Sequence, residues 1–129
     1  MAIGTHTIRV RYSESDQMGV AHHGAYVTWL EECRIELLRQ LGCSYRELEQ
    51  KGILMPVIDV SIRYRRSLRF DDVITCVTTA TAKGPSRIEF TTTLNHGEIL
   101  CAEATVTIAA MAPAGRPIRI PPEIIDVLG

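Results

Sequence analysis

Hydrophobic and polar residues alternate near the beginning of the chain, from Thr5 to Tyr12. A period of two is typical of a β-strand with one face buried. The pattern predicts a first strand here, with Ile8, Val10 and Tyr12 pointing inward.

The pattern then changes to that of a helix, from about Gly24 to Leu41, with Gly42 as the expected C-cap. The apolar residues of this segment cover more than one narrow stripe, and such a helix is usually buried by the structure around it. A second, short helix is predicted near Ser44–Lys51, because Ser44 can cap it and Glu47 follows three residues later.

The remainder of the chain returns to a period of two. Over residues 58–64 the apolar side chains at even positions should face one way and the polar ones the other. Further strands are expected at Val73–Ala82, Arg87–Leu94 and Ile99–Ala110, and the short turns between them predict an antiparallel meander. A proline-rich tail and a last helical turn at Glu123–Leu128 complete the pattern.

These elements predict an α+β fold, because only the sheet can cover the long helix. We expect a single domain over residues 1–129, with a curved antiparallel sheet wrapped around a central helix. The longest apolar runs are too short to cross a membrane, and no basic segment followed by an apolar one marks a secretory signal. The net charge of -1, with both signs interspersed, gives no reason to expect nucleic acid as a partner.

Four cysteines lie among apolar neighbours, and no two form a C-x-x-C pair. The expected interpretation is buried free thiols in a reducing cytoplasm. A nucleophilic cysteine is rejected, because none lies at a helix start or in a basic setting that would activate the thiol.

The candidate chemistry lies in the segment between the first strand and the long helix. Asp16 stands in a turn with Gly19, a few residues before the helix begins. A helix start offers unpaired backbone N–H groups and the positive end of a dipole. A carboxylate beside such donors can attack a carbonyl or activate water while the donors polarise the carbonyl. From the spacing alone, an ordinary Asx-turn aspartate is the simpler interpretation of Asp16, and Gly19 permits a positive φ in either case.

The order of elements and this turn together resemble the hotdog fold and its 4-hydroxybenzoyl-CoA thioesterase family. The resemblance is closest to the small bacterial acyl-CoA thioesterases associated with the Tol-Pal envelope system. Their motif reads Asp-Thr-Asp-x-x-Gly-Val-Val-Tyr-His-x-x-Tyr, followed by a helix with Glu-x-x-Arg. The matching positions here are Glu14-Ser15-Asp16, Gly19-Val20, His23, Tyr26, and Glu31 with Arg34.

A second segment, Ile62–Tyr64 with Ser67–Asp72, resembles the Tyr-x-x-Pro-x-x-Tyr-x-Asp stretch of the family. The chain departs from the family at Glu14, at Ala21-His22 and at Ser67, but it keeps the aspartate at position 16. The departures bear more on the identity of the substrate than on the type of reaction.

The resemblance implies hydrolysis of an acyl-CoA thioester, with Asp16 as nucleophile or general base and a backbone N–H near His23 polarising the carbonyl. It implies no cofactor beyond the CoA of the substrate. It also implies a homodimer with two sites at its interface, usually paired again into a homotetramer. The CoA contacts of the family fall in a later hairpin and strand, and the corresponding candidates are Lys83, Ser86, Arg87 and Arg116.

Several of these residues have simpler interpretations. His23 can orient the substrate, form a hydrogen bond with Asp16 or merely stand at a helix start. The adjacent His22 and His23 would point in different directions on a helix, so they make a poor pair of metal ligands. Tyr26 is a core aromatic or a wall of the acyl pocket. Glu31 either pairs with Arg34 on the helix surface or at an interface, or looks toward the site.

The basic residues at positions 63, 65, 66 and 69 are most simply a solvated strand face, although the 3′-phosphate and pyrophosphate of CoA favour basic residues near the mouth of the site. Three alternatives to the first functional hypothesis stay open at this stage. They are a thioesterase for an aromatic acyl-CoA (hydroxybenzoyl or dihydroxynaphthoyl type), a non-catalytic acyl-CoA binding protein, and a hotdog dehydratase.

Overall fold

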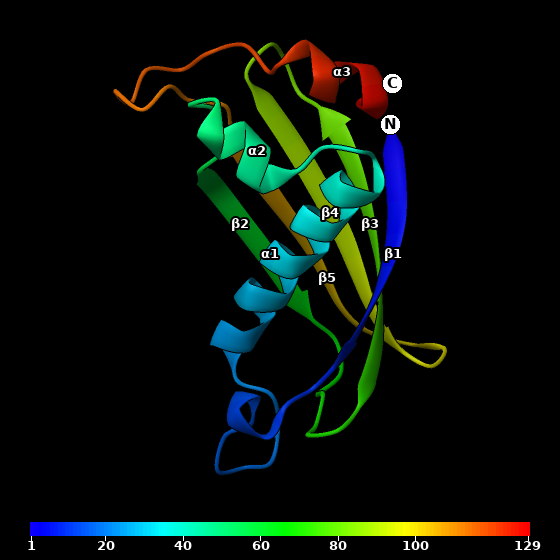
Figure 1. Ribbon diagram of the computed structural model, residues 1–129. Helices are drawn as coiled ribbons and strands as arrows, with labels where there is room; N and C mark the ends of the chain where they lie inside the picture. Colours follow the sequence, from blue (N-terminus) through cyan, green and yellow to red (C-terminus); the bar gives the residue numbers. More distant parts are fainter.

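The computed structural model describes residues 1–129. One sheet holds the five strands in the order β1-β3-β4-β5-β2, and every neighbouring pair is antiparallel. The sheet curves around the long helix α1, while α2 and α3 lie toward the far end of that helix (Figure 1). This confirms the predicted wrapped architecture and the meander β3-β4-β5. The elements are β1 (Ala2–Arg9), the 3₁₀ helix η1 (Tyr12–Glu14), α1 (His23–Gln40), α2 (Tyr45–Gln50), β2 (Val57–Tyr64), β3 (Val73–Ala82), β4 (Arg87–His96), β5 (Ile99–Ala109) and α3 (Pro122–Leu128).

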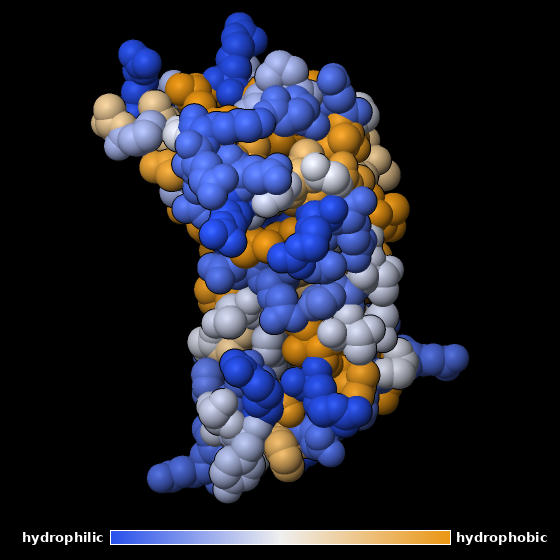
Figure 2. Space-filling model, viewed as in Figure 1, coloured by the Kyte–Doolittle hydropathy of each residue, from blue (hydrophilic) through white to orange (hydrophobic).

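The hydrophobic core lies between α1 and the concave face of the sheet. Trp29, Leu37 and Leu38 of α1 are at most 2% exposed. Alternate residues of the central strands meet them, and Ile74 and Ile88 are fully buried. The outward faces of α1 and α2 carry mostly polar side chains, with smaller apolar patches among them (Figure 2). The broad apolar surface of α1 is therefore covered by the sheet, as the sequence predicted.

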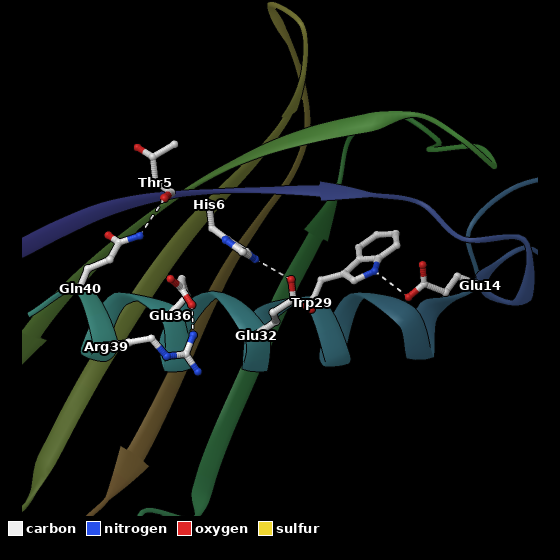
Figure 3. A network of polar contacts seen from close by, with 8 residues as sticks. All are labelled: Thr5, His6, Glu14, Trp29, Glu32, Glu36, Arg39 and Gln40. Atoms are coloured by element: carbon white, nitrogen blue, oxygen red, sulfur yellow. Dashed lines mark hydrogen bonds and ion pairs between the residues drawn. The ribbon is translucent and has the colours of Figure 1, made fainter. Parts of the chain in front are cut away.

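Polar contacts fix one flank of α1 against β1. The imidazole Nε2 of His6 lies 2.5 Å from Oε2 of Glu32, and the Gln40 side chain donates a hydrogen bond of 3.2 Å to the carbonyl oxygen of Thr5 (Figure 3). At the start of α1, His23 and Tyr26 instead contact Tyr64 of β2 through their rings.

The first strand ends earlier than predicted. β1 stops at Arg9, and Tyr12 begins η1 with its side chain 79% exposed, so the prediction of an inward Tyr12 is wrong. Ile8 and Val10 are buried as expected. Pairing with β3 ends at Arg9, because the next N–H, that of Val10, donates to the carbonyl of Asp72 in the loop before β3. The chain then turns, and the alternation of side chains no longer applies.

β2 is an edge strand, paired on one side only, with β5. Val60 stands opposite the buried Val106 of β5, so the even-numbered side chains of β2 face α1, which confirms the predicted alternation. These side chains are nevertheless only half covered: Ile58, Val60 and Tyr64 are 43%, 42% and 44% exposed. An apolar strand with an open edge is a surface on which another chain can pair.

The predicted cap of α2 is confirmed, because the Ser44 hydroxyl accepts a hydrogen bond of 3.3 Å from the Glu47 N–H. The long helix ends one residue earlier than predicted: its C-cap is Leu41, and Gly42 follows that cap with a φ of +85°. None of the helices is long and apolar enough to cross a membrane.

Candidate active site

The turn before α1 holds Asp16 in a fixed orientation. Its Oδ1 accepts hydrogen bonds from the N–H groups of Met18, at 2.8 Å, and Val20, at 3.4 Å. Gly19 donates its N–H to the Asp16 carbonyl at 3.0 Å and has a φ of +78°, which favours glycine. The predicted Asx turn is therefore present. The second carboxylate oxygen, Oδ2, accepts no hydrogen bond from the chain, so it remains available in an exposed side chain.

The start of α1 leaves backbone donors free beside this turn. His22 is the N-cap, and its Nδ1 accepts a hydrogen bond of 3.0 Å from the N–H of Ala25. The N–H groups of His23 and Gly24 have no acceptor within the chain. Unpaired N–H groups at a helix start can bind an oxygen that gains negative charge.

A pocket of about 270 Å³ opens beside the start of α1. Its walls are aromatic on one side: the rings of His23 and Tyr64 stack with centroids 4.8 Å apart, and Tyr26 meets Tyr64 edge-on at 4.9 Å. Burial, with smaller effects of Cys101 and Tyr64, raises the pKa of Tyr26 to about 12, so its phenol stays neutral. Tyr26 is only 3% exposed and is thus both a core residue and a pocket wall. The lining consists of Val20, Ala21, His23, Tyr26, Tyr64, Arg65, Arg66 and Ser67.

The structure brings Asp16, Gly19, His23 and Tyr26 to the same end of the molecule. Asp16 itself does not line the pocket, whereas Val20 at the end of its turn does. Glu31 lies two turns along α1 and is exposed, with its Oε2 3.9 Å from Nη2 of Arg34. Glu31 is therefore outside the pocket of its own chain.

Glu14 has a role that the sequence did not predict. Its side chain is buried and accepts a hydrogen bond from the N–H of Arg11 at 2.7 Å. It also accepts one from Nε1 of Trp29 at 2.9 Å (Figure 3). Burial alone would raise the pKa of Glu14, but the hydrogen bonds from Arg11 and Trp29 outweigh it and lower that pKa. The Glu14 carbonyl also accepts from the N–H of His22 at 2.9 Å. Glu14 thus anchors the Asp16 turn to both the body and the cap of α1.

The predicted CoA contacts lie elsewhere in the chain. Lys83, Ser86 and Arg87 belong to the hairpin between β3 and β4, and Arg116 belongs to the tail after β5, all at the opposite end of the molecule from the start of α1 (Figure 1). The ten residues of β3 separate the two ends by about 30 Å at 3.3 Å per residue. These four residues therefore do not share a pocket with Asp16 within one chain.

The basic segment that follows β2 does reach the pocket. Arg65 and Arg66 line it, although the sequence favoured a solvated strand face for them. The N–H of Ala21 donates to the Leu68 carbonyl at 2.7 Å, which ties this segment to the Asp16 turn. That contact joins residues 47 positions apart, so no local pattern in the sequence could indicate it.

All four cysteines are free and buried, as predicted. Cys101 lies on β5, near Tyr26, and Cys33 lies on α1 within the core. Neither stands at the helix start that borders the pocket.

Comparison with known proteins agrees with this arrangement. The chain is 40% identical over 72 residues to YneP of Bacillus subtilis, a match that covers 56% of this chain and about half, 52%, of that protein. It is 28% identical over 120 residues to the acyl-CoA thioester hydrolase YbgC of Escherichia coli O157:H7, covering 92% of this chain and 90% of that one. The crystal structure of a DHNA-CoA thioesterase from Staphylococcus aureus superposes with a TM-score of 0.92 at 27% identity, covering 98% and 89% of the two chains.

The sequence pattern of one family covers most of the chain, from residue 18 to residue 103. This range contains the end of the Asp16 turn, α1, the edge strand and the basic segment at the pocket. Together with the sheet wrapped around α1, this match shows that the chain belongs to the thioesterase superfamily.

Proposed function

We propose that the protein hydrolyses acyl-CoA thioesters to a free acid and CoA, with Asp16 as nucleophile or general base. The observation that carries the proposal is a free carboxylate in the turn that leads directly into unbonded helix-start donors. The Oδ2 of Asp16 accepts no hydrogen bond in a turn that Glu14 and Gly19 hold in place, and the N–H groups of His23 and Gly24 at the helix start that follows are unbonded. Membership of the thioesterase superfamily and the likeness to YbgC support this reaction.

Two routes lead to the same products. As a nucleophile, the Asp16 carboxylate attacks the thioester carbonyl carbon, the C–S bond breaks, and water hydrolyses the resulting mixed anhydride. As a general base, Asp16 takes a proton from water, and the hydroxide attacks the carbonyl directly. In both routes the C–S bond breaks, and the departing thiolate of CoA takes up a proton from the water that is consumed, which Asp16 carries in the general-base route. The N–H groups of His23 and Gly24 stabilise the carbonyl oxygen as it gains charge, an effect typically worth about 10² to 10³ in rate.

A thioesterase for an aromatic acyl group is the second candidate. The rings of His23, Tyr26 and Tyr64 form one wall of the pocket, and flat aromatic surfaces favour a planar acyl group. A comparison of kcat/KM for benzoyl-CoA with those for acetyl-CoA and decanoyl-CoA separates this candidate from an aliphatic thioesterase.

We further propose that the protein acts as a homodimer or homotetramer. The open edge of β2, with its half-exposed apolar face, is the surface that supports this. A two-fold axis at β2 would pair it antiparallel with its copy. The far end of each chain, with Lys83, Ser86, Arg87 and Arg116, would then approach the Asp16 end of its partner. This arrangement would let those four residues contact CoA across the interface.

The proposed reaction uses no metal or redox cofactor, so dialysis against a chelator should leave turnover unchanged. The buried free thiols fit a reducing compartment, and we propose the cytoplasm.

The decisive test is turnover by Asp16→Asn. The amide keeps the oxygen that accepts from Met18 and Val20, so the turn should persist while the nucleophile or base is lost. We expect kcat/KM across a panel of acyl-CoA thioesters to fall by about 10²-fold or more, with an unchanged circular dichroism spectrum. Asp126→Asn, in the exposed face of α3, is the matched control and should keep full activity.

Near-wild-type rates in a folded Asp16→Asn variant would contradict the assignment of Asp16. If the wild type binds acyl-CoA thioesters tightly but hydrolyses none of them, the protein is a binder and the proposed reaction is wrong.

A further inference from the structure

Two loops meet at the mouth of the pocket. One is the turn that carries Asp16, and the other, residues 65–72, joins β2 to β3. The hydrogen bond from Ala21 to Leu68 and an antiparallel bridge between Val20 and Arg69 join them. Side chains of the second loop therefore lie at the same end as Asp16 and the start of α1.

The arginines of this second loop differ in their partners. Arg65 donates from Nε at 3.0 Å and from Nη2 at 2.7 Å to Oε2 of Glu103, so its charge is matched within the chain. The guanidinium groups of Arg66 and Arg69 have no carboxylate within 4.0 Å.

Arg66 lines the pocket itself, whereas Arg69 lies at its rim. The Nη1 of Arg69 is 3.4 Å from the point that a Cβ on Gly19 would occupy, beside the Asp16 turn.

The acidic groups nearby do not cancel these charges. Glu14 is held by Arg11 and Trp29, and Asp16 Oδ1 is held by its own turn. Asp72 accepts from the backbone N–H of Arg69 and lies 3.8 Å from His96. No acidic residue lines the pocket. Its wall therefore carries one guanidinium, that of Arg66, whose charge the chain does not balance.

We propose that Arg66 binds an anionic group of the thioester substrate and that Arg69 adds to the positive potential at the rim. This inference rests on the proposed function. A guanidinium stays charged at every physiological pH and bonds carboxylate or phosphate oxygens with two parallel N–H groups. The anion has two possible sources with the same chemistry: the phosphates of CoA, or a carboxylate on the acyl group.

The test compares Arg66→Gln with the wild type on four thioesters. Benzoyl-CoA, benzoyl-pantetheine, 4-carboxybenzoyl-CoA and 4-carboxybenzoyl-pantetheine combine an acyl group with or without a carboxylate and a thiol with or without phosphates. The matched control is Arg63→Gln. Arg63 has no carboxylate partner either, but it stands opposite Glu103 on the face of β2 that points away from α1.

We expect Arg66→Gln to lower kcat/KM about tenfold to 100-fold, mainly through KM, for the substrates that carry the recognised anion. If the anion is a CoA phosphate, both CoA thioesters lose rate and the pantetheine thioesters do not. If it is an acyl carboxylate, both 4-carboxybenzoyl thioesters lose rate and the benzoyl ones do not. Arg66→Lys should lower kcat/KM less than Arg66→Gln does, because lysine keeps the positive charge but lacks the two parallel N–H donors of the guanidinium.

The proposal is wrong if Arg66→Gln changes kcat/KM no more than Arg63→Gln does on all four substrates. A wild type that hydrolyses none of the four contradicts the proposed function instead. In that case calorimetry measures the dissociation constants of the same four thioesters for the wild type, Arg66→Gln and Arg63→Gln. The role of Arg66 is contradicted if Arg66→Gln weakens binding no more than Arg63→Gln does.

Discussion

At the scale of single residues, the candidate site depends on a buried carboxylate that does no chemistry. Glu14 connects the Asp16 turn to the indole of Trp29 and, through its carbonyl, to the cap of α1. Glu14 contacts both the turn and the helix. It therefore fixes the position of the free Oδ2 of Asp16 relative to the free N–H groups of the helix start. Glu14 is therefore a positioning residue.

We expect Glu14→Gln to lower the free energy of unfolding at pH 7 by about 1.5 to 3 kcal/mol, the usual worth of hydrogen bonds to a charged group. The pKa of Glu14 is lowered by folding from its ordinary value of 4.5. A lowered pKa gives stability that is present above the unfolded-state pKa and is lost as the pH falls through the folded-state pKa.

The difference in stability between wild type and Glu14→Gln should therefore be constant from pH 7 down to about pH 5. It should shrink below the unfolded-state pKa of 4.5. Urea unfolding followed by tryptophan fluorescence at several pH values measures it. A difference that does not change with pH would contradict a charged Glu14.

At the scale of elements, α1 contains one buried residue whose charge and hydrogen-bond donors are not matched by its surroundings. Arg34 is 7% exposed, its Nε has no hydrogen-bond partner, and the nearest carboxylate, that of Glu31, lies 3.9 Å away. Burial lowers the pKa of the Arg34 guanidinium, with Tyr45 and Glu31 acting in the opposite direction. Holding an unsatisfied cation in this position costs stability within the single chain.

We expect Arg34→Met to leave the free energy of unfolding unchanged or to raise it by about 1 to 4 kcal/mol, because the thioether fills the space without a buried charge. Arg39→Met is the control, since Arg39 is exposed on the same helix and pairs with Glu36. Urea unfolding at low protein concentration measures both variants. A marked loss of stability in Arg34→Met would mean that the guanidinium has an acceptor outside its own chain.

The elements also show which features the sequence could predict. β3 has the predicted bounds, and the predicted β4 and β5 differ from the observed strands by one or two residues at one end, because Thr, Val and Ile alternate there between clear turn residues. The end of β1 was not predictable, because contacts distant in sequence, from Val10 to Asp72 and from Glu14 to Trp29, set it.

The same reasoning separates the two parts of the candidate site. Asp16, Gly19 and His23 lie within one local motif and were predictable from it. Arg66 reaches the pocket only through the contact between Ala21 and Leu68, which the fold creates.

At the scale of the whole molecule, β2 presents an unpaired sheet edge. Its neighbour on one side is β5, and on the other side its backbone has no partner. Half-exposed apolar side chains run along it from Ile58 to Tyr64, ending at the pocket. A strand of this kind favours self-association.

If the protein forms the proposed dimer or tetramer, we expect Val60→Lys to convert it into a monomer, because two lysines would meet near the two-fold axis at the centre of β2. Ile99→Lys, at the exposed start of β5, is the control and should not change the assembly. Sedimentation velocity at micromolar concentration distinguishes these outcomes. A wild type that is monomeric at that concentration would contradict the proposed dimer.

The buried thiols have a practical consequence for all of these measurements. Cys33, Cys43, Cys76 and Cys101 are 2%, 6%, 0% and 2% exposed, and they are spread over α1, the segment before α2, β3 and β5. A chromogenic thiol reagent added to detect released CoA should therefore not modify the cysteines of the folded enzyme. Slow labelling of a given cysteine would instead report the transient opening of the segment around it. The same reagent can thus measure both the rate of thioester hydrolysis and the rate of local opening of the protein.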